Sequence, residues 1–199
     1  MQPKSHALIV IDVQRDFCVG GALAVPQGDD IVEGINAAMA EFSTVILTQD
    51  WHPSGHSSFA SSHQADPFSV IDMPYGPQVL WPDHCIQGTD GADFHPALRT
   101  EGDLIIRKGF NSDIDSYSAF FENDKTTPTG LEGYLRSRGV TDVTCVGLAL
   151  DYCVNYSAQD AAKLGFVTHV RTGLCRAIAP ETEETARAEM AALGVNLQP

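Results

Sequence analysis

The chain has 199 residues, of which 43% are hydrophobic and 19% are charged, and its formal net charge is −14. This length and composition fit one globular domain over residues 1–199 with a full hydrophobic core, and they disfavour disorder. The large negative charge also disfavours nucleic acids and anionic membranes as partners, because phosphate binding requires Lys and Arg. A neutral small molecule is compatible with this charge.

The first residues and the cysteines indicate a compartment. No run of about 18 apolar residues is present, and the opening MQPKSHALIVIDVQRDF has neither a secretory apolar region nor a cleavage site. The five cysteines form no CxxC pair, and their odd number leaves at least one of them free. We therefore expect a cytoplasmic protein with reduced thiols.

Strand-like and helix-like patterns alternate along the chain, which predicts a three-layer α/β/α fold around a mostly parallel six-stranded sheet. In chain order, the predicted strands cover residues 6–12, 44–50, 103–109, 142–150, 166–172 and 195–197. The predicted helices cover 29–42, 153–164 and a segment that begins at Pro180 and ends at Gly194. Their ends carry the expected signals, namely Gly165 after the second helix, and Pro180 with three glutamates in the first turn of the third.

The segment 51–102 interrupts this alternation. It is rich in His, Pro, Ser, Gly and Asp, and shows little periodicity. Segments of this length without regular structure are functional loops or disordered. The histidines and the two tryptophans, Trp51 and Trp81, favour an ordered loop that binds a metal or a substrate.

Three chemically useful residues lie where apolar, strand-like runs end: Asp12, Lys108 and Cys153. The carboxyl ends of parallel strands share one edge of a sheet, so an acid, a cation and a thiol from distant parts of the chain can meet there. Such a trio suits nucleophilic catalysis. Cys153 also opens a predicted helix, where the helix dipole lowers a thiol pKa and backbone N–H groups can bind an oxyanion.

Each of these residues also has an ordinary interpretation. Asp12 could cap a helix or form a salt bridge, Lys108 could be a solvated surface charge, and Cys153 could be a buried core cysteine. Their coincidence at three strand ends favours the catalytic interpretation.

A second group consists of Asp50, His52 and His84. Asp50 and His52 lie two positions apart at a strand end and share a face. One carboxylate and two imidazoles can hold a divalent metal such as Zn²⁺ with positions left open for a ligand. The alternative is hydrogen bonding within the loop. Further candidate ligands are His56, His63 and Asp66.

Six strings carry a family resemblance: IDVQRDF (11–17), TQDWHP (48–53), LWPDHC (80–85), IRKG (106–109), YSAF (117–120) and GLALDYCV (147–154). In order and spacing they resemble nicotinamidases of the isochorismatase-like cysteine hydrolase superfamily, over nearly the whole chain. GLALDYCV is typical of the branch with a cysteine nucleophile, and DWHP together with WPDHC is typical of nicotinamidases. The string RTGLCRAI (171–178) departs from the family pattern because it lacks the acid that commonly precedes CRA.

The resemblance implies roles for the first group. Cys153 would be the nucleophile, Asp12 would accept its proton and later donate it, and Lys108 would orient Asp12 and favour the thiolate. The resemblance also implies a cis peptide bond between Leu148 and Ala149. The N–H groups of Ala149 and Cys153 would then bind the developing oxyanion.

The resemblance likewise implies that Asp50, His52 and His84 bind one metal ion, usually zinc, although such ligands also accept Fe²⁺ or Mn²⁺. The pyridine nitrogen of the substrate would bind this metal and leave the carboxamide facing Cys153. Asp115 matches an acidic position that contacts metal-bound water in some members, and members differ on whether a histidine at His56 is a ligand. The implied substrate-binding side chains are Phe17, Trp81, Tyr117 and Leu148, although aromatic residues are more often part of the core.

The predicted function is therefore hydrolysis of nicotinamide to nicotinic acid and ammonia through a cysteine thioester, a reaction of NAD salvage. Pyrazinamide is a second candidate substrate. Family members differ in oligomeric state, so a homo-oligomer stays open.

Four alternatives remain. A related amidase acting on a carbamoyl or ureido substrate would generally lack the metal group, and an isochorismatase would lack the cysteine. A non-haem iron oxygenase would also use a carboxylate and two histidines, but these enzymes favour all-β folds. A zinc-binding or redox-sensing module without catalysis would leave Asp12 and Lys108 without a purpose.

Overall fold

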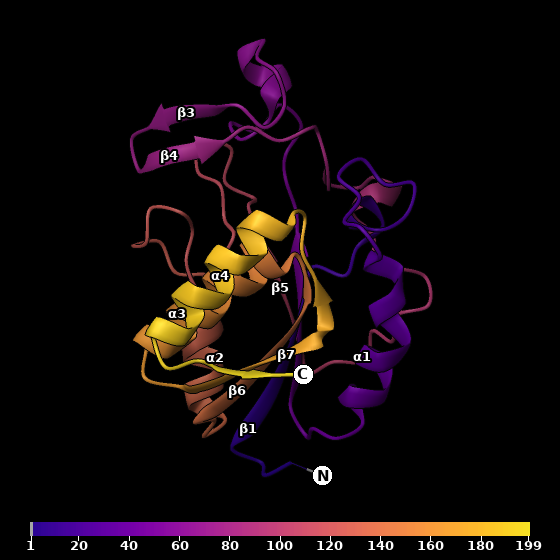
Figure 1. The fold of residues 1–199 in the computed structure, drawn as a ribbon, viewed down its shortest axis with the longest axis vertical. Helices are drawn as coiled ribbons and strands as arrows, with labels where there is room; N and C mark the ends of the chain where they lie inside the picture. The colour runs from indigo at the N-terminus through magenta and orange to yellow at the C-terminus, as the bar shows by residue number, and fades with distance from the viewer. Residues whose placement is uncertain (1) are drawn as a thin grey trace.

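The computed structural model describes residues 2–199 and contains a six-stranded sheet in which every pair of neighbouring strands is parallel (Figure 1). The strand order is β5-β2-β1-β6-β7-β8. The predicted strands are all present, as β1 (His6–Ile11), β2 (Val45–Asp50), β5 (Leu104–Lys108), β6 (Asp142–Leu148), β7 (Val167–Arg176) and β8 (Asn196–Gln198). The prediction of a six-stranded α/β sheet is therefore confirmed.

Helices cover both faces of the sheet, as predicted. In Figure 1, α1 (Val32–Met39) lies on one side, and α2 (Leu131–Ser137), α3 (Asn155–Lys163) and α4 (Pro180–Ala192) lie on the other. Because both faces are covered, the central strands are near-continuous apolar runs, and residues 7–11 of β1 are all buried. The short helix α2 has no counterpart among the predicted helices, since it has only seven residues and contains Gly133, which weakens helix propensity.

The turn after β6 differs from the prediction. β6 ends at Leu148, the Leu148–Ala149 peptide bond is cis as the resemblance implies, and a π-helical turn over Leu150–Val154 leads into α3. Cys153 therefore lies inside this π-helical turn and not at the first residue of an α-helix. The predicted helix over 29–42 is likewise shorter, consisting of a 3-10 turn (Gly28–Ile31) and α1.

The segment 51–102 is ordered. It contains the antiparallel hairpin of β3 (Val70–Met73) and β4 (Gly76–Val79), together with short 3-10 turns. Its first residues are fixed by backbone hydrogen bonds from Trp51 N–H to the Lys108 carbonyl and from His52 N–H to the Cys85 carbonyl. Figure 1 shows the hairpin at the top of the molecule, beyond the carboxyl ends of the central strands.

The strand order indicates where the ligand-binding crevice of this fold lies. Strands are added in one direction from β1 through β2 to β5, and in the other from β6 to β8, so the order reverses between the neighbours β1 and β6. In open α/β sheets, ligands bind at such a switch point outside the carboxyl ends of the strands.

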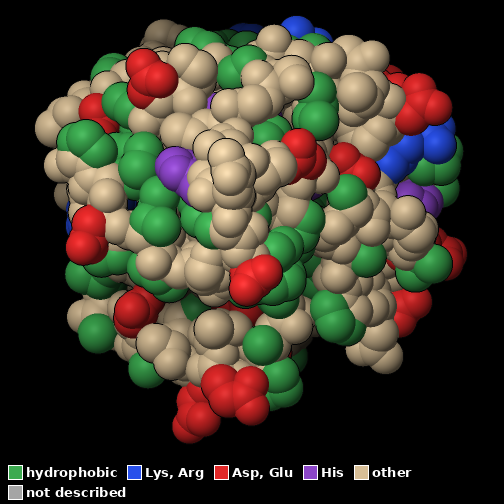
Figure 2. All heavy atoms as spheres, turned by 90° about the horizontal axis from the view of Figure 1, so that it is seen from above, with side chains coloured by type: hydrophobic (Ala, Val, Ile, Leu, Met, Phe, Trp, Pro, Cys, Tyr) green, Lys and Arg blue, Asp and Glu red, His purple; other side chains and the backbone are tan. Residues whose placement is uncertain are grey.

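On the face seen from above the hairpin, acidic side chains outnumber basic ones. Figure 2 shows acidic side chains scattered over this face, while basic side chains lie near its edges. This distribution agrees with the net charge of −14 and offers no basic patch for a nucleic acid on the face shown. Among the helices in residues 2–199, none is long and apolar enough to cross a membrane.

Candidate active site

The three residues predicted to meet at the sheet edge do lie together. Asp12 follows β1, Lys108 ends β5, and Cys153 lies in the turn after β6. The Lys108 ammonium nitrogen Nζ is 2.8 Å from Asp12 Oδ2 and 3.5 Å from Cys153 Sγ. Asp12 is 0% exposed, Lys108 1% and Cys153 7%, so their charges act in a site largely closed to water.

The backbone and a threonine fix the direction of Asp12. Asp12 has a positive φ of 47°, a conformation that Asp adopts more readily than most residues. Thr48 on β2 accepts the Asp12 N–H at 3.1 Å and donates to Asp12 Oδ1 at 2.6 Å. Oδ2 is thereby turned toward Lys108, and it accepts no well-aligned hydrogen bond from the described part of the chain, residues 2–199. It is therefore available to take a proton.

Lys108 joins this group to the second one. Its Nζ also lies 2.7 Å from Asp50 Oδ1 and donates to the Ser116 carbonyl at 2.8 Å. Burial disfavours the ammonium, but Asp12 and Asp50 outweigh it and hold the pKa of Lys108 well above its usual range. Lys108 is thus a fixed positive charge between two carboxylates and a thiol.

The electrostatics of Cys153 reverse one expectation. Burial raises the pKa of the Cys153 thiol well above its usual range, and the carboxylates of Asp12 and Asp50 add to this effect while Lys108 opposes it. The prediction that the helix start would lower this pKa is therefore wrong. Burial also raises the pKa of Asp12, again against Lys108. The thiol keeps its proton at rest, and the neighbouring acid is more basic than an exposed aspartate.

Asp50, His52 and His84 converge on one point. Asp50 Oδ2 lies 3.2 Å from His52 Nε2 and 3.5 Å from His84 Nε2, and all three residues are buried. His52 Nδ1 lies 2.9 Å from the Gly109 carbonyl, and His84 Nδ1 lies 2.8 Å from the Pro82 carbonyl. Because a carbonyl only accepts, each Nδ1 carries a proton, so the nitrogen of each ring that can offer a lone pair is Nε2, which faces Asp50.

This arrangement fits a cation. Two ring nitrogens and a carboxylate oxygen face one another, and within residues 2–199 the buried His52 Nε2 has no hydrogen-bond partner. Burial opposes a charge on His52, but Asp50 outweighs it and raises the pKa of His52, so a proton can occupy this position when no metal does. The donor set of two imidazoles and one carboxylate, with each imidazole held by a carbonyl behind it, suits Zn²⁺ and related divalent ions.

Asp115 and His56 lie beside this cluster, and each is held by other partners. His56 donates from Nε2 to the Asn111 carbonyl at 2.8 Å and accepts the Ser58 N–H at Nδ1. Ligand-type atoms of Asp115, His52 and His56 lie within 4.8 Å of one another, and Asp115 also borders the pocket described next. His63 and Asp66 belong to none of the three metal-type clusters found among residues 2–199.

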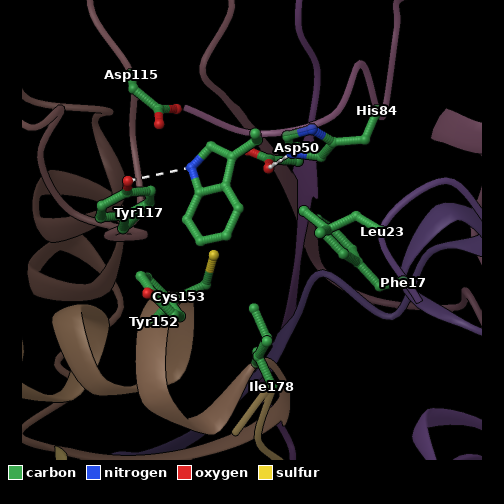
Figure 3. A pocket seen from close by; sticks show the side chains of 11 residues that line it. Phe17, Leu23, Asp50, His84, Asp115, Tyr117, Tyr152, Cys153 and Ile178 are labelled. Carbon is green, nitrogen blue, oxygen red and sulfur yellow. Dashed lines mark hydrogen bonds and ion pairs between the residues drawn. The ribbon is translucent and has the colours of Figure 1, made fainter. Parts of the chain in front are cut away.

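A pocket opens above Cys153. In Figure 3 the Cys153 sulfur points into it, with Phe17 and Leu23 on one side, Tyr117 on the other, and Asp50 and His84 at the far end. Leu148 is fully buried and does not line it. The lining residues are Phe17, Leu23, Asp50, Trp81, His84, Asp115, Tyr117, Ala149, Tyr152, Cys153 and Ile178. Three of these, Leu23, Tyr152 and Ile178, were not among the predicted site residues.

Two further residues that the sequence analysis did not single out position the site. The Gln14 side chain accepts the Asp50 N–H and donates to the Asp50 carbonyl, both at 2.8 Å, and so fixes the backbone of a metal-ligand candidate. Asp151 accepts the N–H groups of Ile178 and Ala179, which ties the Cys153 turn to the start of α4. Both residues lie inside the strings that carry the family resemblance, and this was the available signal.

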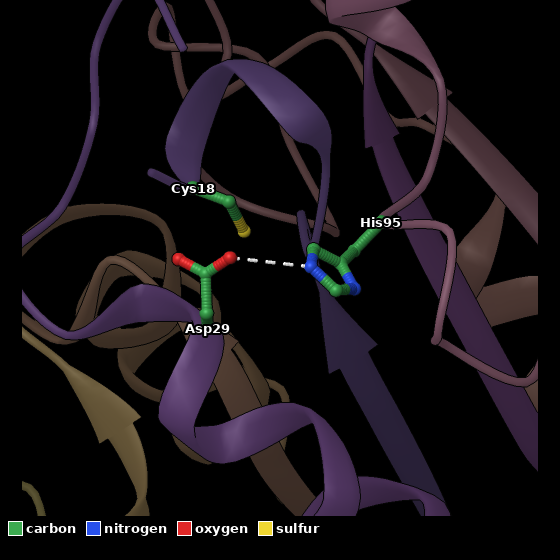
Figure 4. Close-up of side chains that lie close together, drawn as sticks. All are labelled: Cys18, Asp29 and His95. Carbon is green, nitrogen blue, oxygen red and sulfur yellow. Dashed lines mark hydrogen bonds and ion pairs between the residues drawn. The ribbon is translucent and has the colours of Figure 1, made fainter. Parts of the chain in front are cut away.

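A second cluster of ligand-type atoms lies elsewhere. Cys18, Asp29 and His95 lie close together, and His95 Nε2 is 3.2 Å from Asp29 Oδ1 (Figure 4). Here His95 Nδ1 accepts the Ala97 N–H, so the ring proton is on Nε2 and is donated to Asp29. The imidazole therefore has no free lone pair directed at the cluster, which does not favour metal binding.

The chain matches known proteins along its whole length. The family model described as Isochorismatase domain matches residues 6–198. A nicotinamidase of Acinetobacter baylyi is 53% identical over 179 residues, which cover 89% of this chain and 84% of the relative.

Two solved structures extend the likeness. A nicotinamidase and pyrazinamidase of Acinetobacter baumanii has a TM-score of 0.98 at 50% identity, with 100% of this chain and 97% of the other covered. A pyrazinamidase of Pyrococcus horikoshii in complex with zinc has a TM-score of 0.82 at 37% identity, covering 98% and 99%. With its parallel sheet, its switch-point site and these matches, the chain belongs to the isochorismatase family of hydrolases.

Proposed function

We propose that this protein hydrolyses nicotinamide to nicotinic acid and ammonia through a thioester on Cys153, as a cytoplasmic enzyme of NAD salvage. The observation that carries the proposal is the placement of Cys153, Lys108 and Asp12 beneath a pocket whose far end holds the Asp50 and His84 metal-type ligands. A site of this kind can hold an aromatic ring at one end and react with its amide at the other.

The first chemical step is attack by sulfur. Asp12 Oδ2 takes the proton of the Cys153 thiol, and the sulfur bonds to the carbonyl carbon of the amide while Lys108 balances the negative charge. The raised pKa of Asp12 makes this transfer less unfavourable than it would be to an exposed carboxylate. The N–H groups of Ala149 and Cys153 stabilise the oxyanion, and removing one such donor typically raises the barrier by roughly 3 kcal/mol.

The remaining steps return the proton. Asp12 protonates the amide nitrogen, the carbon–nitrogen bond breaks, and ammonia leaves behind a thioester. Asp12 then removes a proton from water, whose oxygen attacks the thioester carbon. The carbon–sulfur bond breaks, nicotinic acid leaves, and the proton on Asp12 returns to the sulfur.

Asp50, His52 and His84 would hold the metal ion. When bound there, such an ion supplies a Lewis acid that can take the lone pair of the pyridine ring nitrogen. The zinc complex of the Pyrococcus horikoshii pyrazinamidase supports zinc as the metal. Asp115, at the border of the pocket, would accept hydrogen bonds from water on that ion.

The pocket walls suit a flat ring. Trp81, Tyr117 and Tyr152 contact one another edge to face, with ring centroids 4.8 to 6.1 Å apart, and Phe17 lies opposite Tyr117. The same walls would admit pyrazinamide, whose ring has the same size.

The test is ammonia release by the purified, metal-loaded protein with nicotinamide, pyrazinamide or a ureido compound as substrate, and with Cys153→Ala as control. We expect release from nicotinamide by the native protein alone. Release from the ureido compound only would move the function to the related carbamoyl or ureido amidases. Equal release by Cys153→Ala would contradict the thioester mechanism.

A further inference from the structure

One buried glutamine connects the β3–β4 hairpin to the pocket. Of the residues in β3 and β4, Gln78 alone is buried, and it is completely inaccessible to solvent. A hairpin is commonly anchored by an apolar side chain, because burying an amide costs free energy unless its hydrogen bonds are made. A buried glutamine at this position is therefore stable only if its amide has hydrogen-bond partners.

The partners of Gln78 fix the orientation of its side-chain amide. Gln78 Nε2 lies 2.8 Å from Asp115 Oδ2, 2.9 Å from the Tyr117 hydroxyl and 2.7 Å from the Val79 carbonyl. Gln78 Oε1 accepts from the Tyr75 hydroxyl and from Asn123 Nδ2. Turning the amide over would place its oxygen against a carboxylate and a carbonyl, so the donor end must face Asp115 and Tyr117.

The Gln78 amide nitrogen connects polar groups of residues that line the pocket. Tyr117 oxygen accepts from Gln78 and also from Trp81 Nε1 at 3.1 Å, while Asp115 accepts from Gln78 and from the Ser116 N–H. In Figure 3 the Tyr117 hydroxyl and the Asp115 carboxylate lie on the same side of the pocket, above Tyr152. Trp81, Tyr117 and Asp115 are thus aligned through a single side chain that does not itself line the pocket.

We propose that Gln78 is a positioning residue that sets substrate affinity by holding Trp81, Tyr117 and Asp115 in the orientation that shapes the slot for the aromatic ring. The proposal rests on the hydrolysis proposed above, because the affinity concerned is that for an aromatic amide. The hydrogen-bond partners of the Gln78 side chain are Tyr75, Val79, Asp115, Tyr117 and Asn123, and none of them is Cys153, Lys108 or Asp12. Gln78 therefore acts on the binding of the ring and not on the steps at sulfur.

Gln78→Met tests this by keeping an unbranched side chain of similar length while removing the amide oxygen and the amide nitrogen. Asp115 and Tyr117 would lose a buried partner, and we expect KM for nicotinamide to rise about ten-fold or more. The chemistry at Cys153 is untouched, so we expect kcat to stay within about three-fold of the native value. The matched control is Gln64→Met, at an exposed residue whose side chain makes no hydrogen bond among residues 2–199.

A second readout needs no substrate. In a Trp51→Phe background, Trp81 is the one remaining tryptophan, and its fluorescence emission reports the surroundings of its indole N–H. We expect Gln78→Met to shift this emission and Gln64→Met to leave it unchanged. An unchanged emission together with an unchanged KM in Gln78→Met would overturn the proposal, since Gln78 would then only fill space.

An isosteric pair of variants covers the case in which Gln78→Met does not fold. Gln78→Glu replaces the donor by an acceptor facing Asp115, and adding Asp115→Asn restores a donor on the opposite side. We expect the emission of Trp81 to shift in Gln78→Glu and to return toward the native value in the double variant. Native KM and native emission in Gln78→Glu would overturn the proposal. If the native protein released no ammonia from nicotinamide, the proposed function would fail, while the emission comparison would still decide the role of Gln78.

Discussion

The two clusters centred on Asp50 and on Cys18 contain similar ligand types, but their histidine protons lie on opposite ring nitrogens. His52 and His84 donate from Nδ1 to carbonyls and direct their Nε2 lone pairs at Asp50. His95 accepts at Nδ1 and donates from Nε2 to Asp29. Closeness of ligand-type atoms therefore does not define a metal site. The hydrogen-bond partner of each imidazole decides which ring nitrogen is free to bind a metal.

The thiols of Cys18 and Cys153 differ in the groups that lie beside them. Burial, together with Asp29, raises the pKa of Cys18 to about 12, and no lysine in residues 2–199 acts against these two causes. Cys153 is also held protonated by burial, but Lys108 lies 3.5 Å from its sulfur and Asp12 lies ready to accept its proton. A cation and a base beside the sulfur separate a candidate nucleophile from a core cysteine.

The strongest test of this contrast is to remove each thiol in turn. Cys153→Ala should lower kcat for nicotinamide by roughly 10⁴-fold or more, because no other group can form the thioester. Cys18→Ala should leave kcat within about two-fold, since its sulfur has no partner that would make it a nucleophile. Steady-state ammonia release measures both, and comparable losses would remove the distinction between the two thiols.

The second test concerns Lys108, the buried cation beside Cys153. Lys108→Met leaves Asp12 and Asp50 buried near each other without a cation, which should lower the free energy of unfolding by about 3–5 kcal/mol. Lys125→Met breaks an ion pair with Asp160 whose lysine is 43% exposed, and should cost about 1 kcal/mol or less. Urea denaturation of the metal-free proteins gives both values. Equal losses would contradict the view that Lys108 is held by buried charges.

Metal content tests the comparison of the two clusters themselves. His52→Ala or His84→Ala removes a converging lone pair, so metal affinity should fall at least about a hundred-fold, whereas His95→Ala should retain native affinity. Elemental analysis after dialysis against a chelating resin gives the metal bound per chain. A comparable loss in His95→Ala would mean that the second cluster also binds metal.

The smallest expected effect is a shift in pH dependence. The reaction needs Asp12 ionised, and burial raises its pKa, so kcat/KM should fall on the acid side as pH drops through this raised value. The Thr48 hydroxyl stabilises the carboxylate, so Thr48→Val should raise the pKa further and move the acid limb upward by about one unit or less. Thr168→Val, at a buried threonine on β7, is the control. A downward shift in Thr48→Val would contradict the stabilisation of the Asp12 carboxylate by the Thr48 hydroxyl.

The sheet and the two groups of site residues could be predicted because their signals are local. Strands covered on both faces are continuous apolar runs, and parallel topology then brings Asp12, Lys108 and Cys153 to one edge. Residue type and spacing suggested Asp50, His52 and His84 as a metal group, with hydrogen bonding within the loop as the alternative, and the family strings favoured the metal. The cis peptide bond before Ala149 came from the family strings alone. The ordered character of 51–102 was also expected, although its hairpin was not.

The features that could not be predicted depend on tertiary contacts, which leave no local pattern in the sequence. The walls formed by Leu23, Tyr152 and Ile178 come from loops and turns whose positions are set by packing. The pKa of Cys153 was predicted in the wrong direction, because the depth of its burial and its nearness to two carboxylates follow from the fold and not from its place near a helix start. Gln78 lay in a segment without clear periodicity, so nothing in the sequence marked it as the buried residue of a hairpin.

The most direct test of the account is to look for the thioester itself. Native protein mixed with nicotinamide, quenched with acid during turnover and digested, should give a peptide containing Cys153 that is heavier by one nicotinoyl group, while peptides containing Cys18 stay unmodified. Turnover without any adduct on Cys153, with activity retained in Cys153→Ala, would contradict the account and point to direct attack by water.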